Sequence, residues 1–199
     1  MKNSLIIVAF FTVGILTGIK LSHIGYALTF DLSLYALYIL LFLIGLSVGA
    51  DKRFRHMLKM VRPAIVLVPL SVIAGTGLAA IGVSFILRGL TVRELLAVGS
   101  GFGYYSLSSV IITQIRGPSL GVIALLANIT REIITLLLAP ILARYLGKLA
   151  PIAAGGATAM DTTLPVITRF SGKEYAVIAV FSGIVLTLLV PLFVTLLLR

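Results

Sequence analysis

Several long apolar segments constrain this chain more than any other feature of its sequence. A helix needs about 20 consecutive apolar residues to cross a bilayer, and runs of roughly that length recur, for example over residues 175–198. The composition agrees, since 60% of the residues are hydrophobic, 11% are charged and the mean hydropathy is +1.19. Transmembrane β-barrels are built from short segments of alternating hydrophobicity, unlike these continuous runs. We therefore predict an all-α polytopic protein of the cell membrane, with lipid as its surroundings.

The net charge of +10 indicates an orientation in the membrane and not a nucleic-acid partner. Basic residues gather in short loops between apolar runs, as cytoplasmic loops do. The strongest cluster covers residues 51–62, which we place in the cytoplasm, so that residues 20–31 face outside. The sequence has no cysteine, which excludes disulfides and thiolate metal sites. Its two histidines, His23 and His56, have no partner at metal-ligand spacing, and we expect neither a metal nor another cofactor.

Seven segments are candidates for membrane crossings, and two of them are expected to be interrupted. The segment over residues 151–170 either crosses once as a broken helix or enters and returns. The first choice gives about seven crossings and the second gives six with a re-entrant hairpin. We treat 1–199 as a single membrane transporter domain, with a three-helix unit over 1–93 and an interrupted-helix unit carrying the site over 94–199. The predicted segments are Ser4–Ile19, Leu32–Ala50, Pro63–Leu87, 95–115, 119–143, 151–170 and Tyr175–Leu198.

The segment over residues 95–115 contains small and polar residues where a transmembrane helix would be apolar. Glycine alternates with other residues at positions 99, 101 and 103, and hydroxyl side chains follow. Glycine costs about 1 kcal/mol relative to alanine in a helix interior, so a bend or unwound patch is expected. The alternative is a groove of small residues for close helix packing. The candidate site residues here are Gly101, Gly103, Tyr105, Ser106 and Ser108.

A second polar stretch, over residues 155–165, places a carboxylate between apolar segments. It combines two glycines, three threonines and a proline with Asp161. Irregular backbone at membrane depth is tolerated only where it is buried in protein or lines a water-filled cavity. An ionisable residue at that depth indicates a function, because it is expensive to keep there. Asp161, Thr162 and Thr163 are therefore candidate site residues for a charged solute.

Three more polar residues lie in the middle of the apolar segment 119–143. Arg131 and Glu132 follow Asn128 by three and four residues, which places all three on one helix face. Each charge at the bilayer centre costs about 2.5–3.5 kcal/mol on insertion scales, so this face must look inward. We predict that it lines a polar cavity between the two interrupted segments. The alternative is a purely structural ion pair of Arg131 with Asp161 or Glu132.

This set of groups suits a zwitterionic or cationic solute. Broken helices expose N–H groups that attract carboxylates, while free carbonyls and acidic side chains hold cations. Asp161 and Glu132 are candidates for an ammonium group or for a coupling proton or sodium ion, and Arg131 for an α-carboxylate. The sequence has no ATP-binding P-loop and no catalytic motif. We therefore predict a secondary transporter and not an enzyme, with no catalytic residues.

The motifs at these positions resemble those of the LysO-type lysine exporters, which are bacterial and archaeal inner-membrane proteins that expel L-lysine and toxic analogues. The resemblance extends over the whole chain in the order and length of its helices. It implies L-lysine export driven by an ion gradient, at a site lined by Asp161, Arg131, Glu132 and the segment Ser100–Ser108. The motifs that carry it are Ser100–Ser108, Gly117-Pro118, Asn128 with Arg131-Glu132, and Gly156–Val166.

The resemblance also implies a partner for this chain. By this resemblance, full-length members carry a further N-terminal three-helix unit, and we expect this sequence to begin after it. We expect a second copy, in a homodimer, or a separate small three-helix protein to supply it. Two alternatives to lysine export stay open: an exchanger for another cationic amino acid or a simple cation, and a membrane subunit that does not transport.

Overall fold

The computed structural model of the chain describes residues 12–20, single positions between 35 and 50, and residues 63–87 and 89–199. Two compact units divide the chain, Met1–Ile39 and Leu40–Arg199. Residues 12–20 of the first unit form a helix, which lies within or beside the predicted segment Ser4–Ile19. Most of the predicted helix Leu32–Ala50, both histidines and the predicted loops 20–31 and 51–62 lie outside the described residues.

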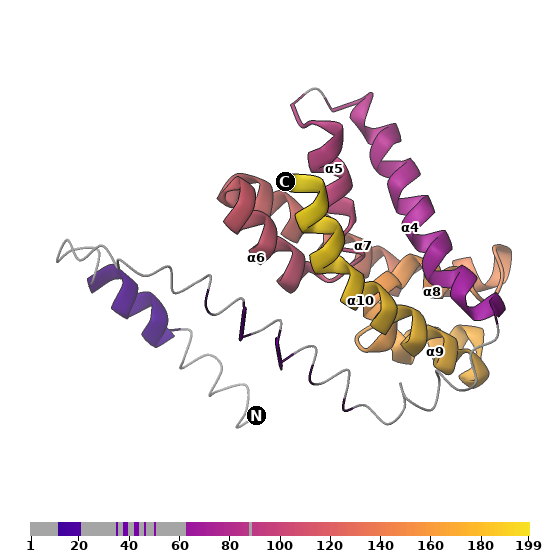
Figure 1. The fold of residues 1–199 in the computed structure, drawn as a ribbon. Helices are drawn as coiled ribbons and strands as arrows, with labels where there is room; N and C mark the ends of the chain where they lie inside the picture. The colour runs from indigo at the N-terminus through magenta and orange to yellow at the C-terminus, as the bar shows by residue number, and fades with distance from the viewer. Residues whose placement is uncertain are drawn as a thin grey trace. The chain divides into compact units, whose positions relative to one another are not determined.

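The described part of the second unit is built from helices alone (Figure 1), which confirms the all-α prediction for these residues. Three of the helices are long and apolar enough to cross a membrane, over Ile65–Ser84, Pro118–Tyr145 and Lys173–Leu198. The count of about seven crossings and the choice between a crossing and a re-entrant hairpin over 151–170 stay predictions, as does the division at residues 93 and 94. The elements are α4 (Pro63–Ser84), α5 (Val92–Gly99), α6 (Tyr105–Arg116), α7 (Pro118–Tyr145), α8 (Ala150–Gly155), the 3₁₀ turn η1 (Gly156–Met160), α9 (Leu164–Ser171), the 3₁₀ turn η2 (Lys173–Tyr175) and α10 (Ala176–Leu198).

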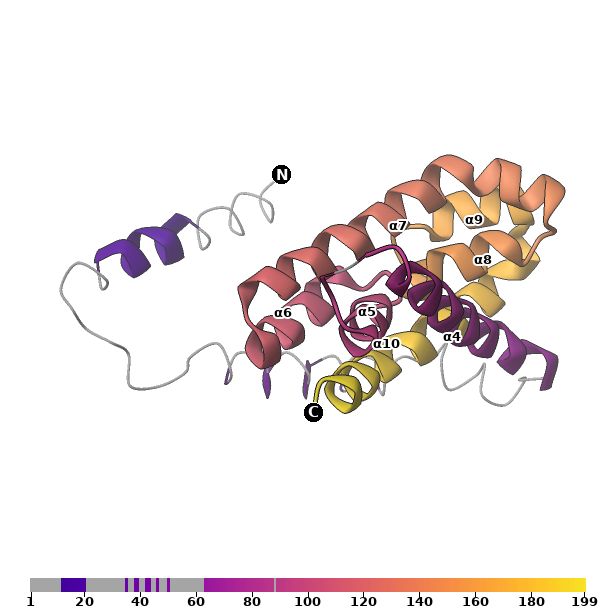
Figure 2. The same ribbon diagram turned by 90° about the horizontal axis from the view of Figure 1, so that it is seen from above.

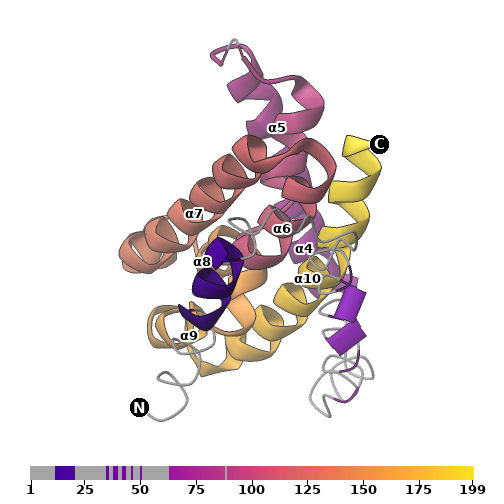
Figure 3. The same ribbon diagram turned by 90° about the vertical axis from the view of Figure 1, so that its left-hand side faces the viewer.

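The helix α7 is the element along which the others are arranged. Gly117, with φ +89°, turns the chain sharply between α6 and α7, so that the two helices lie side by side in opposite directions (Figure 2). The C-terminal half of α7 packs against α8 and α9. The last helix, α10, packs against α6, α5, α4 and η1 (Figures 1 and 3). Residues that are 60 or more positions apart in the sequence thus meet around η1.

A capping box determines where α5 begins. The Thr91 hydroxyl accepts a hydrogen bond from the Glu94 N–H, and the Glu94 carboxylate accepts from the Thr91 N–H at 2.8 Å and from its hydroxyl. These bonds favour the charged carboxylate and lower the pKa of Glu94. Because α5 has only eight residues, a defined start also positions its C-terminal end at Gly99.

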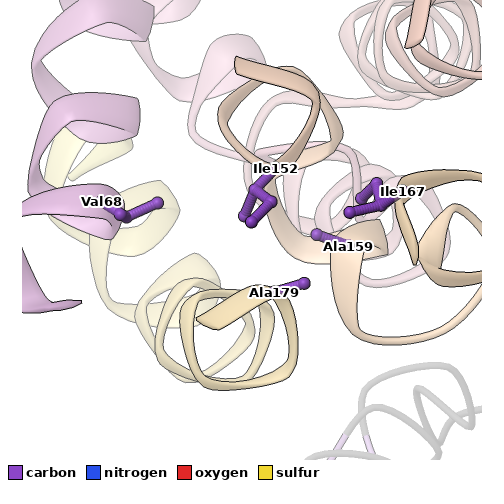
Figure 4. Close-up of a cluster of buried hydrophobic side chains, with 5 residues drawn as sticks. All are labelled: Val68, Ile152, Ala159, Ile167 and Ala179. Carbon is purple, nitrogen blue, oxygen red and sulfur yellow. The ribbon is translucent and has the colours of Figure 1, made fainter. Parts of the chain in front are cut away.

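Apolar side chains from five different elements meet beside η1 (Figure 4). Ile152 of α8 and Ile167 of α9 are completely buried there, and Leu164, Tyr175 and Ile178 pack around the cluster. In lipid, helix association depends on such close packing, because the surrounding chains are as apolar as the side chains themselves. The cluster therefore holds the short helices α8 and α9 against the longer ones. Its members are Val68, Ile152, Ala159, Ile167 and Ala179.

We expect Ile152→Ala to lower the free energy of unfolding by about 2 kcal/mol, because the substitution leaves a cavity in this cluster. The control Leu126→Ala removes an α7 side chain that is 58% exposed, and should change stability by less than about 0.5 kcal/mol. Unfolding by sodium dodecyl sulfate in mixed micelles measures both. Equal effects of the two variants would contradict the assigned core.

Candidate functional site

The first helix break separates α5 from α6 over residues 100–104. Phe102 and Gly103 both have positive φ, +48° and +97°, a left-handed conformation that is unusual for a residue with a side chain. Turn hydrogen bonds Phe102 N–H to Gly99 C=O, at 2.9 Å, and Tyr104 N–H to Gly101 C=O, at 2.7 Å, replace the helical ladder. Gly101, Phe102 and Gly103 are buried. The predicted interruption is therefore an unwound, buried segment in the structure.

Asn128 of α7 holds this break in place. Its Oδ1 accepts from the Gly103 N–H at 2.7 Å, while its Nδ2 donates to the carbonyls of Val98 at 3.0 Å and Ala124 at 2.9 Å. Both amide N–H groups and the carbonyl are thus engaged with backbone. Gly101 approaches so closely that a Cβ there would lie 2.5 Å from Nδ2 and 2.6 Å from the hydroxyl of Ser108. The structure thus brings four predicted site residues together at the first break. They are Gly101 and Gly103 within it and Ser108 and Asn128 beside it.

The second helix break runs from Gly156 to Thr163. Gly156 has φ +62° and ψ −122°, a backbone conformation that is open almost only to glycine. The chain then forms one 3₁₀ turn and reaches α9, which has a proline in its first turn. The Thr158 C=O accepts from the N–H groups of Asp161 and Thr163, both at 3.1 Å, and the hydroxyls of Thr158 and Thr163 lie 3.4 Å apart. Thr163 is completely buried.

The two breaks contact one another directly. The Ala157 N–H donates to the Phe102 C=O at 2.8 Å. A Cβ on Gly156 would collide with that same carbonyl oxygen, and one on Gly103 would lie 3.0 Å from the Gly155 C=O. Unwound backbone needs hydrogen-bond partners where water is excluded, and each break supplies one to the other. The structure thus brings together the two segments that the sequence analysis expected to face each other.

The helix α10 covers the other side of this junction. Gly183 sits so close to η1 that a Cβ there would lie 2.6 Å from the Met160 Cβ and 2.8 Å from the Ala157 carbonyl oxygen. The ring of Phe193 meets that of Phe102 edge-on, with centroids 6.0 Å apart. The junction is therefore enclosed between α7 and α10.

Arg131, one turn beyond Asn128 on α7, is bound to the end of α8, just before the second break. Its Nε donates to the Ala154 C=O at 2.8 Å and its Nη2 to the Ala153 C=O at 3.0 Å. These are among the last carbonyls of α8, where the helix dipole favours a cation. A third bond, of 3.1 Å, joins Nη1 to the hydroxyl of Thr76 on α4. No ion pair joins Arg131 to Asp161 or Glu132, all three of which the structure describes.

A cleft of about 750 Å³ lies between α4, α7 and α8, and Arg131 forms part of its wall. Its other lining residues are mainly small or aliphatic, with the hydroxyls of Thr76 and Thr130 among them. None of the other predicted site residues lines this cleft. The candidate site therefore has a cationic part, the cleft, and a second part around Asp161.

Asp161 and Thr162 lie on the exposed surface of the described part of the chain, at the end of η1. The Asp161 Oδ1 accepts from the Thr162 N–H at 2.6 Å and from its hydroxyl at 3.3 Å. None of the described residues donates to Oδ2. The phenol of Tyr104, at the end of the first break, lies within electrostatic range of this carboxylate. A free carboxylate oxygen beside the joined breaks is suited to binding a cation.

The remaining predicted site residues lie at the edges of the junction. Ser106 is exposed in the first turn of α6, and Tyr105 is half-buried beside it. Glu132 is half-buried on α7, and its carboxylate has no hydrogen-bond or ion-pair partner among the described residues. Within the described ranges, no group of three His, Asp or Glu side chains is placed to hold a metal ion.

Comparison with known proteins shows to which family a chain with these two joined breaks belongs. A family model described as "Lysine exporter LysO" matches residues 8–198, nearly the whole chain. The chain belongs to this family. The match confirms the resemblance drawn from the motifs and, with the three apolar helices, identifies a multi-pass protein of the inner membrane.

Two curated relatives share this similarity. The "Lysine exporter LysO" of Escherichia coli is 34% identical over 164 residues, which are 82% of this chain and 54% of that protein. The "Putative lysine exporter" of Haemophilus influenzae is 44% identical over 103 residues, which are 52% of each chain. The present chain therefore spans about half the length of the curated relatives it matches. No solved structure matches it.

Several residues of the junction were missed by sequence reasoning. Thr76 binds Arg131, and Gly183 lets α10 approach η1. Gly183 is the only glycine in the apolar helix α10, and glycine in a helix interior is costly, so it carried a usable signal. Thr76 stands between two glycines of α4 in a purely apolar context, and nothing in the sequence pairs it with α7.

We expect Gly156→Ala to lower the free energy of unfolding by about 2 kcal/mol or more, because its left-handed backbone strains any side chain and the new Cβ would meet the Phe102 carbonyl. The matched control is Gly82→Ala in α4, where a Cβ meets no atom within 4 Å and alanine favours the helix. Thermal unfolding in detergent compares them. A Gly156→Ala protein as stable as the control would contradict the joined-break geometry.

We expect Asn128→Leu to expose the Gly103 amide, because it removes all three hydrogen bonds from the side chain while keeping a similar volume. Each buried group left unpaired costs about 1–3 kcal/mol. Hydrogen–deuterium exchange of residues 98–104 should accelerate, whereas the control Thr168→Val, which loses a bond on the exposed side of α9, should leave that segment protected. Unchanged exchange in Asn128→Leu would contradict the clamping role.

Proposed function

We propose that this chain exports L-lysine and close analogues as a secondary transporter driven by a proton or sodium gradient. The observation that carries the proposal is the junction itself: two helix breaks, joined to each other and held by one polar helix face, in a chain of the lysine exporter family. Interrupted helices at corresponding places are typical of transporter binding sites. Both similar relatives also bear the name of lysine exporters.

The proposal assigns opposite ends of the solute to opposite charges. Asp161, with one oxygen free of donors in the described structure, would hold the side-chain ammonium group of lysine or the coupling ion, and Arg131 would hold the α-carboxylate. Glu132, which is also unpaired among these residues, is the second acidic group. Tyr105, Ser106 and Thr162 would offer polar contacts, and Asn128, Thr163, Gly101, Gly103 and Ser108 would keep the broken backbone in position. A second copy of the chain, or a small three-helix protein, stays the predicted partner, and the molar mass of the purified complex tests for it.

We expect Asp161→Asn to reduce lysine flux by about tenfold to a hundredfold, because a charge-assisted hydrogen bond contributes about 1.5–3 kcal/mol. The measurement is uptake of labelled lysine into proteoliposomes with a preset proton or sodium gradient. The matched control Glu174→Gln neutralises an exposed carboxylate in η2 and should keep full flux. Undiminished lysine flux in Asp161→Asn would remove Asp161 from the site.

The same preparation separates the alternatives. Flux of arginine, ornithine or sodium without flux of lysine would replace the proposed solute by another cation. A membrane subunit that does not transport would be favoured by two results together. None of these solutes would be moved, and neither Thr162→Cys nor Ser106→Cys would react with a water-soluble thiol reagent. The absence of native cysteine makes such labelling specific.

A further inference from the structure

The cation in the wall of the α4–α7–α8 cleft has no counter-charge within the described part of the protein. Arg131 lies midway along α7, a helix apolar enough to cross the membrane, where an unneutralised guanidinium costs about 2.5–3.5 kcal/mol. Its three hydrogen bonds all go to neutral acceptors, two carbonyls and one hydroxyl. Asp161 and Glu132 do not pair with it. An anion entering the cleft would meet a charge that the described residues leave uncompensated.

The guanidinium also has hydrogen-bonding capacity left. It carries five N–H donors, and three of them are used, so that one remains on each terminal nitrogen. A planar guanidinium matches the two oxygens of a carboxylate better than any other side chain does. The Thr76 hydroxyl, which accepts from Nη1, still has its own proton to donate to the same ligand.

The rest of the cleft fits an aliphatic chain. About 750 Å³ lies within the range of small-molecule sites, about 300–1,000 Å³. Apart from Arg131 and the hydroxyl residues, the walls are formed by small or aliphatic residues of the three helices, among them Val72, Ala79, Ala127 and Ala153. The hydroxyl residues are Ser71, Thr76, Thr130 and Thr135. Such walls can cover methylene groups, but they offer no carboxylate to an ammonium group.

We infer that this cleft binds the carboxylate end of an amino acid, held by Arg131 and Thr76, so that the protein selects solutes that carry a carboxylate. The inference rests on the proposed function and deepens it, because it names which end of the solute enters the cleft. The side-chain ammonium of lysine, at the far end of the molecule, points away from Arg131 by charge repulsion, toward acidic groups elsewhere. A diamine of the same length has no group for this position and is excluded.

Three probes of matched length test the inference: lysine, 6-aminohexanoate, which keeps the carboxylate, and cadaverine, which lacks it. The reporter is Ala127→Cys, exposed in the cleft wall one turn before Arg131, labelled with a water-soluble maleimide in proteoliposomes. At about ten times its dissociation constant, a bound ligand should slow labelling about tenfold. We expect lysine and 6-aminohexanoate to protect the reporter and cadaverine to have no effect. Leu146→Cys, 72% exposed and outside the cleft, is the control for non-specific effects.

The Arg131 and Thr76 side chains are tested by substitution in the reporter background. Arg131→Gln should abolish protection, and Thr76→Val, which keeps its shape, should weaken it about threefold to tenfold through one lost hydrogen bond. If Arg131→Gln fails to fold because α8 loses its capping bonds, Thr76→Val still tests whether this side chain contributes to ligand protection. The control Thr195→Val on α10 should leave protection unchanged. A purely structural role for Arg131 would lower stability without making protection depend on the carboxylate.

Each outcome bears on one proposal or the other. Three outcomes would overturn the carboxylate site and leave the proposed export intact. They are equal protection by cadaverine and lysine, a reporter that does not react at all, and lysine flux without protection. Protection by 6-aminohexanoate in a protein that does not move lysine would support the carboxylate site and overturn the proposed solute. Absence of protection by any carboxylate overturns the inference.

Discussion

Hydrogen bonding of the unwound backbone is the constraint on which the rest of this structure depends. Two helices are interrupted inside a protein that belongs in lipid, and every free N–H or C=O in such a break needs a partner. The bond from Ala157 to Phe102 satisfies one group of each break with the other. Local turn bonds satisfy several of the other groups. Two side chains of α7 add to them, since Asn128 accepts from the Gly103 N–H of the first break and Arg131 binds the end of α8. Removing one break would therefore leave the other without its partner.

This arrangement explains why small residues are required at the junction. Gly101, Gly103, Gly156 and Gly183 each stand where a Cβ would meet a neighbouring atom at 3.0 Å or less. The contacts come from three directions, from α7, from the facing break and from α10. Close approach of backbones is how helices associate in lipid, and here it also brings polar backbone groups within hydrogen-bonding distance. The same glycines thus allow both the breaks and their packing.

The distribution of charge follows from this support. The guanidinium of Arg131 neutralises part of the negative end of α8 yet keeps its net charge, and it faces a cleft with mainly apolar walls. The carboxylate of Asp161 lies on the exposed end of η1, with one oxygen free of donors among the described residues. Separate cationic and anionic parts suit a solute that carries both charges, whereas a direct ion pair between them would have neutralised the site.

Sequence reasoning reached the all-helical fold class and both helix breaks, for identifiable reasons. Apolar length alone predicted α4, α7 and α10, and their observed bounds differ from the prediction by only a few residues. Glycine and hydroxyl patterns predicted both breaks, because helix propensity and the cost of polar groups in lipid are local properties. The motifs also indicated the family, which the family match confirms. The positions of the helix pairs had no comparable signal, since Thr76 and Arg131 are 55 residues apart.

The sequence by itself determined that this chain forms membrane helices with two polar interruptions and an internal arginine, glutamate and aspartate. Only the tertiary structure decided how those groups are used. An ion pair of Arg131 with Asp161 or Glu132 was compatible with the sequence, but in the structure Arg131 binds the carbonyls of α8 and the hydroxyl of Thr76. Asn128 was expected in a cavity wall, yet its amide is fully engaged with backbone groups of the first break, of α5 and of α7 itself. The physical reason is that unpaired backbone groups away from water form hydrogen bonds with the nearest polar side chains. Which side chains are nearest depends on long-range packing.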